Sequence, residues 1–171
     1  MLTPDRCAPE DPSPATQKLM LDTNVIDKLA ADPELVDRLS ASAERGEVQL
    51  LVTHLQIDEV LEIGDHARAM REALLQVLAS LPAERVPTYG FLLDRSRLDH
   101  AALASDNHAA LFRELTRGNP RHHEDVLILL TAAWLYADLV TDNKKDLAKM
   151  AARIGVTVLD TQGLRGLVFD T

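Results

Sequence analysis

Cysteine, aromatic residues and long apolar runs are all scarce in this chain of 171 residues. The single cysteine, Cys7, excludes an internal disulfide and fits a protein of the reducing cytoplasm. Aromatic residues make up only 4% of the chain, so the core must be built from Leu, Val, Ile and Ala. No apolar run is long enough to cross a membrane, and residues 1–17 lack the apolar centre of a signal peptide. We therefore expect a cytoplasmic protein with no membrane segment.

Basic residues are also few, because 18 lysines and arginines stand against 27 acidic residues, for a net charge of −9. This balance counts against tight, sequence-independent binding to long nucleic acids. It is compatible with a small RNA target, with a basic protein partner, or with acidic residues gathered around a metal ion. Three arginines at helical spacing are either RNA contacts or a solvated helix face: Arg113, Arg117 and Arg121.

The chain is long enough for one well-buried domain, and 46% of its residues are hydrophobic. Residues 1–16 contain four prolines and no periodic apolar pattern, which predicts a flexible tail. Residues 17–171 are then expected to form the domain.

Apolar runs typical of buried strands alternate in this domain with amphipathic segments typical of helices. Strands are predicted over 18–22, 48–52, 86–88, 139–141 and 156–159. Helices are predicted from the cap Asn24 to Ala31, from the cap Thr53 through Leu61 to a break at Gly64-Asp65, and over 33–44, 66–81, 106–116, 144–154 and 162–168. Another starts near His122 or His123 and runs through Leu135. This alternation predicts an α/β protein with three α/β/α layers around a central parallel sheet of four to five strands.

Acidic residues stand where the predicted strands end. Asp22 closes the first strand, and Asp142 follows the strand over 139–141. Glu59 lies on the helix after the second strand, and Asp125 opens an almost wholly apolar helix. Because the carboxyl ends of parallel strands meet at one edge of a sheet, we expect these acids to converge. Asp146, one helical turn after Asp142, competes with it for the last position.

Converging carboxylates repel one another and resist ionisation at neutral pH unless a cation lies between them. A site with only oxygen ligands favours Mg²⁺ or Mn²⁺ over zinc. Such an ion lowers the pKa of a bound water and stabilises the charge that develops on a phosphate. The pattern therefore predicts a metal-dependent nuclease.

Each acid also has an ordinary structural explanation when taken alone. Asp22 and Asp142 have the positions of a helix cap and a turn residue, and Asp125 would favour the dipole of its helix. Glu59 and Asp146 could both lie on solvated helix faces. His122 and His123 allow a histidine–aspartate metal site or a phosphate contact, but no cysteine or spaced histidine completes a zinc set.

Four stretches, in order, resemble the motifs of the PIN domain family, which includes the VapC-type toxin ribonucleases. The resemblance covers roughly residues 18–159. The motifs are Leu21-Asp22-Thr23-Asn24-Val25-Ile26-Asp27, Thr53 with Glu59-Val60-Leu61 six residues on, Glu124-Asp125-Val126-Leu127-Ile128-Leu129-Leu130-Thr131-Ala132, and Val140-Thr141-Asp142-Asn143-Lys144-Lys145-Asp146-Leu147.

This resemblance implies a PIN-like fold and a set of site residues. Asn24 and Thr141 would support the site with an amide and a hydroxyl, and Asp146 remains the alternative last acid. The residues that would bind the metal and carry the catalysis are Asp22, Glu59, Asp125 and Asp142.

The leading hypothesis is therefore a Mg²⁺- or Mn²⁺-dependent endoribonuclease in which a metal-activated water hydrolyses RNA. The resemblance implies the toxin of a toxin–antitoxin module, with an antitoxin protein as partner. We also expect a homodimer, because the aliphatic stripe over 66–81 is either core or a dimer face. The alternative is a catalytically weak PIN-like module that binds proteins in a regulatory complex. A phosphotransfer domain with Asp22 as nucleophile ranks lower, because Asn24 stands where such enzymes use an acid.

Overall fold

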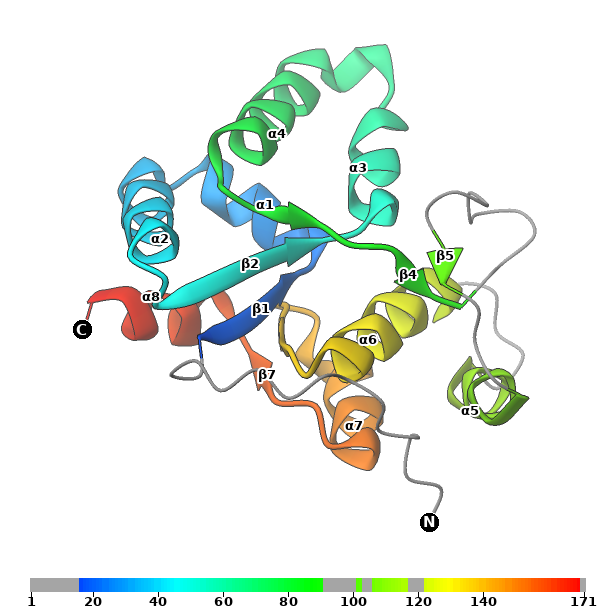
Figure 1. The fold of residues 1–171 in the computed structure, drawn as a ribbon. Coiled ribbons are helices and arrows are strands. Elements are labelled where there is room, and N and C mark those ends of the chain that lie inside the picture. The colour runs from blue at the N-terminus through cyan, green and yellow to red at the C-terminus, as the bar shows by residue number, and fades with distance from the viewer. Residues whose placement is uncertain (1–15, 91–100, 103–105, 117–121, 170–171) are drawn as a thin grey trace.

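The domain is an α/β structure with an all-parallel central sheet. The computed structural model describes residues 16–90, 101–102, 106–116 and 122–169. Among these residues the central sheet has five strands in the order β3-β2-β1-β6-β7 (Figure 1). Its strands are β1 (Gln17–Leu21), β2 (Val48–Val52), β3 (Glu84–Arg85), β6 (Asp138–Val140) and β7 (Val158–Leu159). The predicted three-layer α/β architecture is confirmed.

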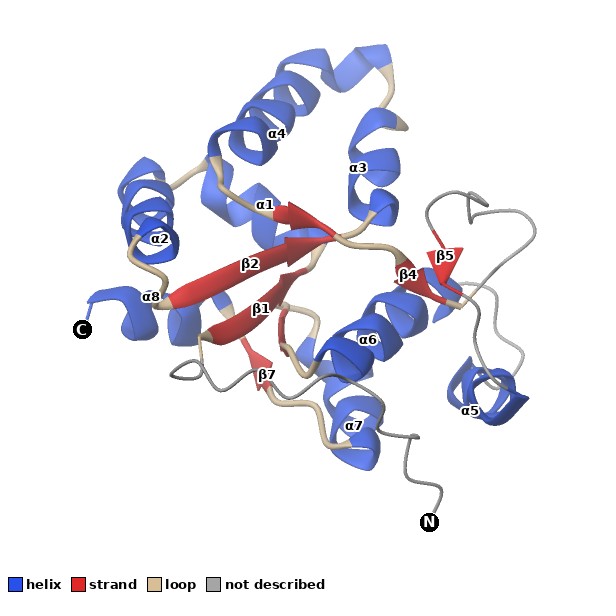
Figure 2. Cartoon of the chain, in the orientation of Figure 1, coloured by secondary structure: helices blue, strands red, loops and turns tan. Residues whose placement is uncertain are grey.

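Helices cover both faces of the sheet and connect its strands (Figure 2). Several begin and end within a residue or two of their predicted bounds because a capping residue marks the start or a glycine follows the end. Asp32 caps α2, Thr53 caps α3 and Gly155 ends α7. The helices are α1 (Thr23–Ala30), α2 (Pro33–Glu44), α3 (His54–Leu61), α4 (Arg68–Ser80), α5 (Asp106–Thr116), α6 (His123–Leu135), α7 (Lys144–Ile154) and α8 (Thr161–Phe169).

Alternate residues of β1 lie in two separate hydrophobic cores, because successive side chains of a strand point to opposite faces of the sheet. Leu19 and Leu21 point into a core that α1, α2, α4 and α8 cover. Met20 points into the opposite core, which α6 and α7 cover. Helix α5 packs outside α6 through Leu115. The near-continuous apolar character of α6 follows from its position between the sheet and α5.

Three local predictions differ from the structure. Asp22 caps α1, as its ordinary structural explanation allowed, and the predicted cap Asn24 lies inside the helix, because the helix begins two residues earlier than a cap at Asn24 would place it. The strand predicted over 86–88 is not found: β3 ends at Arg85, β4 (Thr88–Tyr89) begins at Thr88, and β4 pairs with β5 (Ala101–Ala102) in a second sheet. Pro87 lies between the two strands, where its missing N–H does no harm to either ladder. The last strand, β7, is also shorter than predicted.

The stripe predicted over 66–81 is largely core. A short 3-10 helix, η1 (Asp65–Ala67), precedes α4. Leu74 and Val77 are buried in the first core, whereas Met70 is 47% exposed. A homodimer through this helix therefore stays a prediction.

Some predictions fall outside the described residues. These include the tail over 1–15, Arg117 and Arg121, and the side chain of Asp146. None of the helices in the described ranges combines the length and the apolar character that a bilayer crossing requires.

Candidate active site

The carboxyl ends of β1, β2 and β6 form one edge of the central sheet. The strands β2, β1 and β6 are parallel neighbours, so their final residues lie side by side. The backbone N–H of Asp22 donates to the carbonyl of Val140 at 3.0 Å, which brings the two strand ends into direct contact. Asp22, Thr53 and Thr141 are thereby placed at the same edge.

Asp22 is the most buried acid at this edge, with 5% of its surface exposed. Its Oδ1 accepts a hydrogen bond from the N–H of Thr23 at 2.8 Å. Its Oδ2 accepts from the hydroxyl of Thr141 at 2.6 Å and from the amide of Asn24 at 2.5 Å. Three donors from two segments far apart in sequence thus fix the orientation of this carboxylate.

The pKa of Asp22 lies above its usual value. Burial is the main cause, because it disfavours the charged form of the carboxyl group. The hydrogen bonds from Thr141, Thr23 and Asn24 oppose this shift, and the negative charge of Asp142 adds to it. Asp142 is therefore close enough for its charge to act on Asp22.

Glu59 joins the site from α3. Its Oε2 accepts a hydrogen bond from the hydroxyl of Thr23 at 2.5 Å. Thr23 thus contacts two acids, with its backbone N–H on Asp22 and its hydroxyl on Glu59. Although part of the side chain is exposed, burial raises the pKa of Glu59, and the charges of Asp22, Glu124 and Glu62 raise it further.

Asp125, in the first turn of α6, is the third member. Its pKa is raised to about 6, first by burial and then by the charges of Asp22 and Glu59. His122 opposes the shift and Glu124 adds to it. Asp22, Glu59 and Asp125 therefore lie within one another's electrostatic field, although they come from three different elements.

Asp142 is exposed and is held from both sides. Its backbone N–H donates to Oδ1 of Asn24 at 2.9 Å. Its carboxylate accepts from the backbone N–H and the hydroxyl of Thr161 at 2.9 and 2.8 Å. Of the two candidates for the last acid, Asp142 is the one whose side chain is described, and it adjoins Asn24 and Asp22.

Two residues of this network were missed by the sequence analysis. Gln56 is fully buried, accepts from both the N–H and the hydroxyl of Thr53, and donates to the carbonyl of Leu21 at 2.7 Å. The spacing of Thr53 and Gln56 is that of a capping box and could have indicated the local contact. No sequence signal connects Thr161 with Asp142, because 19 residues separate them.

The acids at this edge offer oxygen ligands only, the kind that hard divalent ions prefer. Among the described side chains, no three histidine, cysteine or acidic groups lie close enough to form a ready ligand set. Mg²⁺ keeps several of its waters and binds through one or two direct carboxylates, so a looser group of oxygen donors can hold it. The raised pKa values of Asp22, Glu59 and Asp125 reflect burial and uncompensated negative charge, which a divalent cation would neutralise. Binding of magnesium or manganese at this edge stays a prediction.

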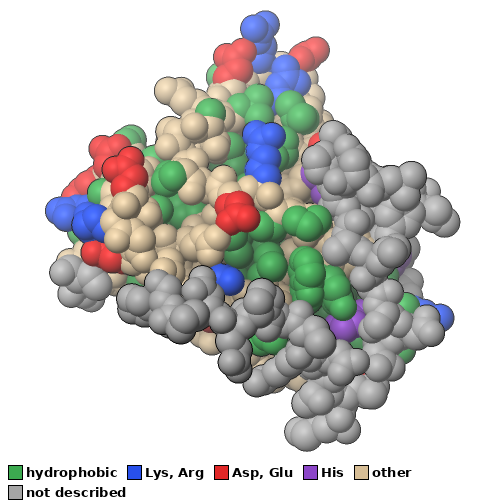
Figure 3. All heavy atoms as spheres, in the orientation of Figure 1, with side chains coloured by type: hydrophobic (Ala, Val, Ile, Leu, Met, Phe, Trp, Pro, Cys, Tyr) green, Lys and Arg blue, Asp and Glu red, His purple; other side chains and the backbone are tan. Residues whose placement is uncertain are grey.

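The predicted RNA contacts are only partly described. Arg113 is exposed on α5. His123 packs against Phe112, with their ring centroids 5.3 Å apart. In the view of Figure 3, lysine and arginine side chains are scattered among acidic ones and form no continuous basic stripe on this face of the described residues. A contact between RNA and these arginines stays a prediction.

The fold and this edge define an α/β domain with an acidic site at the carboxyl ends of its parallel strands. No protein-family model matches the sequence, and neither does any curated protein. Among solved structures, the chain is similar to a chain from the 2.2 Å structure of VapBC-1 from nontypeable Haemophilus influenzae. The two share 18% sequence identity with a TM-score of 0.47, over 84% of this chain and 98% of that chain. This similarity assigns no function to the present chain.

Proposed function

We propose that the protein is a metal-dependent endoribonuclease that hydrolyses RNA phosphodiester bonds. One observation carries the proposal: Thr23 donates to both Asp22 and Glu59 at the carboxyl edge of the sheet, and the charges of these two acids act on Asp125. Placing such acids together costs stability, and a cation-binding function explains why the fold would hold them there.

The residues of the site would have different roles. Asp22, Glu59 and Asp125 would hold Mg²⁺ or Mn²⁺, with Asp142 completing the set. Thr141 and Asn24 donate to one oxygen of Asp22 and the N–H of Thr23 donates to the other, while the hydroxyl of Thr23 donates to Glu59. When bound, the ion supplies a more acidic water and positive charge for the phosphate. The rigid hydrogen bonds reduce the reorganisation that the site would otherwise need.

The toxin assignment rests on the four sequence motifs and belongs to the same proposal. If the chain is the toxin of a toxin–antitoxin module, its expression without a partner should arrest growth of the host. The same arrest is not expected for the Asp22→Asn variant produced at an equal level. Colony counts after induction would measure both, and equal growth with the two proteins and with an empty vector would contradict the toxin role.

The ribonuclease activity is tested by RNA cleavage with Mn²⁺ and with EDTA. We expect cleavage by the wild type only with metal, and a rate at least about 100-fold lower in Asp22→Asn, because the variant removes a central negative charge. Glu59→Gln should also lose activity, and its exposed position makes unfolding a poor explanation. Asp27→Asn, an exposed position on α1, is the matched control and should cleave at the wild-type rate. Equal cleavage by the wild type and Asp22→Asn would remove the hypothesis.

A protein-binding role is the second candidate, and the net charge of −9 favours it. In that case no metal-dependent cleavage would be found, and a basic partner would bind the wild type and Asp22→Asn equally.

A further inference from the structure

The first residue of α8 holds the carboxylate of Asp142. Thr161 uses two donors, since its backbone N–H binds Oδ1 at 2.9 Å and its hydroxyl binds Oδ2 at 2.8 Å. Asp142 is exposed, so its side chain would otherwise rotate freely in solvent. One residue thus fixes both oxygens of an exposed acid.

Helix α8 does not need Asp142 as its cap, because Asp160 already has that role. The Oδ1 of Asp160 accepts from the N–H of Gly163 at 2.7 Å, and its carbonyl accepts from the N–H of Leu164 at 2.8 Å. These are the contacts of an ordinary N-cap residue. The long-range pair between Thr161 and Asp142 is additional, so capping alone does not account for it.

The pair continues a chain of hydrogen bonds that reaches Asp22. The amide of Asn24 donates to Oδ2 of Asp22 at 2.5 Å, while its Oδ1 accepts from the N–H of Asp142 at 2.9 Å. Asp142 is therefore fixed at its backbone from the side of α1 and at its carboxylate from the side of α8. Both attachments are needed to define where its oxygens lie relative to Asp22.

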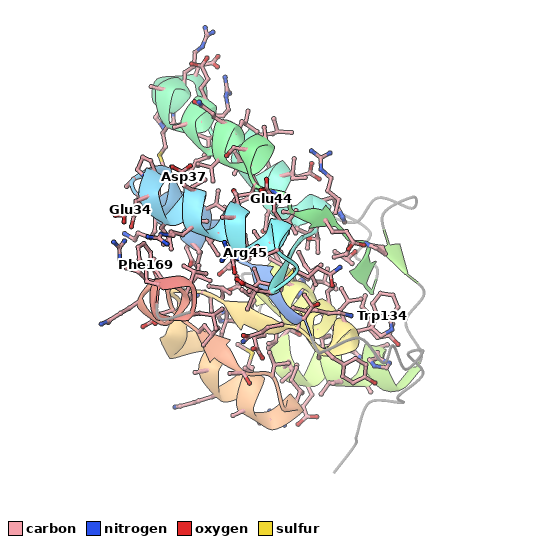
Figure 4. All side chains as sticks on the ribbon, turned by 60° about the vertical axis from the view of Figure 1, so that its left-hand side comes forward. Glu34, Asp37, Glu44, Arg45, Trp134 and Phe169 are labelled. Carbon is pink, nitrogen blue, oxygen red and sulfur yellow. The ribbon has the colours of Figure 1, made fainter. Side chains whose placement is uncertain are left out.

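Helix α8 is itself anchored firmly. Leu164 and Val168 are buried in the core that the helix shares with β1 and α2. Arg165 forms an ion pair with Asp32, and the ring of Phe169 has the guanidinium groups of Arg165 and Arg38 at 4.6 and 5.1 Å from its centroid. Figure 4 shows Phe169 beside α2. Thr161 thus belongs to a rigid element.

We infer that Thr161 is a positioning residue, which holds the carboxylate of Asp142 in the orientation that metal binding at this edge requires. The inference rests on the proposed function, because Asp142 is taken there as part of the metal site. Mutation of a residue that orients a metal ligand usually lowers the metal affinity by about 10- to 100-fold.

A graded series of variants tests this role in the full chain. Thr161→Ser keeps both donors, Thr161→Val keeps only the N–H, and Thr161→Pro removes both. Proline is well tolerated at the first position of a helix, so the last variant should fold. We expect Mn²⁺ affinity, measured by titration calorimetry, to be unchanged in Thr161→Ser. It should fall by roughly 10-fold in Thr161→Val and further in Thr161→Pro.

Two controls separate positioning from a general loss of structure. Thr157→Val makes the same chemical change at an exposed position just before β7 and should bind Mn²⁺ as the wild type does. In an Asp142→Ala background, Thr161→Val should have no further effect on affinity, because the group through which it acts is gone. Thermal denaturation of each variant reports whether the fold is intact.

The outcomes distinguish the inference from the function on which it rests. Mn²⁺ binding by the wild type with equal affinity in Thr161→Pro would overturn the inference and leave the nuclease proposal standing. A further loss of Mn²⁺ affinity caused by Thr161→Val in the Asp142→Ala background would overturn the inference as well. Failure of the wild type to bind Mn²⁺ would overturn both.

Discussion

Asp125→Asn is expected to make the metal-free protein more stable while abolishing RNA cleavage. Burial and the charges of Asp22 and Glu59 raise the pKa of Asp125 from 3.8 to about 6, so its ionised form is unfavourable in the folded state. Asparagine has nearly the same shape and carries no charge. At about pH 7.5 the gain should be about 1–3 kcal/mol, or several degrees in Tm. Cleavage should fall at least about 100-fold, because the site loses one of its charges.

The pH dependence of stability follows from the same shift. Between the unfolded pKa of 3.8 and the folded value of about 6, the folded protein binds more protons than the unfolded chain. The stabilising contribution of Asp125 is therefore fully present below its unfolded pKa of 3.8. It is lost as the pH rises through the folded pKa of about 6. Differential scanning calorimetry at about pH 5 and pH 7.5 should show a smaller difference for Asp125→Asn than for the wild type.

The exposed Asp37 on α2 supplies the control for this prediction. Asp37→Asn should leave the Tm at neutral pH within about 2 °C of the wild type, because a substitution at an exposed surface position usually changes stability by less than about 0.5 kcal/mol. A Tm for Asp125→Asn that is equal to or below that of the wild type, without metal, would contradict the account of the site as a destabilising cluster.

Gln56→Ala should cause a large loss of stability. Gln56 is fully buried and satisfies the carbonyl of Leu21 together with the N–H and hydroxyl of Thr53. Its removal leaves buried polar groups without partners and a cavity between α3 and the end of β1. We expect a loss of about 3 kcal/mol. For a chain of this size the Tm should fall by about 6–12 °C in thermal denaturation.

Gln76→Ala is the matched variant, since Gln76 is exposed on α4 and alanine favours a helix. Its Tm should stay within about 2 °C of the wild type. An equally small decrease in Tm for both glutamine variants would mean that Gln56 has no special role in joining the ends of β1 and β2.

The local elements were predictable where the chain carries its own start and stop signals. Helices α5 and α7 have their predicted bounds, and Gly155 ends the latter in a left-handed conformation that glycine favours. The prediction over 86–88 was wrong because strands as short as β3 and β4 have no periodicity to detect. Their pairing with β2 and β5 comes from the tertiary fold.

The acids at the strand ends were predictable for a topological reason. Parallel strands joined by helices bring their carboxyl ends to one edge, so Asp22 and Asp142 had to lie near each other once the sheet was correct. Glu59 and Asp125 come from helices, and their approach depends on how α3 and α6 pack. Their mutual effects on pKa are a result of that packing.

The sequence by itself determined which of the longer segments become strands and helices, and that Asp22 and Asp142 follow strands ending at a common edge, because hydrophobic period and chain direction are local properties. Only the tertiary structure decided what orients those acids. Thr161 reaches Asp142, Thr23 bridges Asp22 and Glu59, and Gln56 ties α3 to β1. Such contacts depend on side-chain directions and distances that exist only after the layers have packed, so no spacing along the chain encodes them.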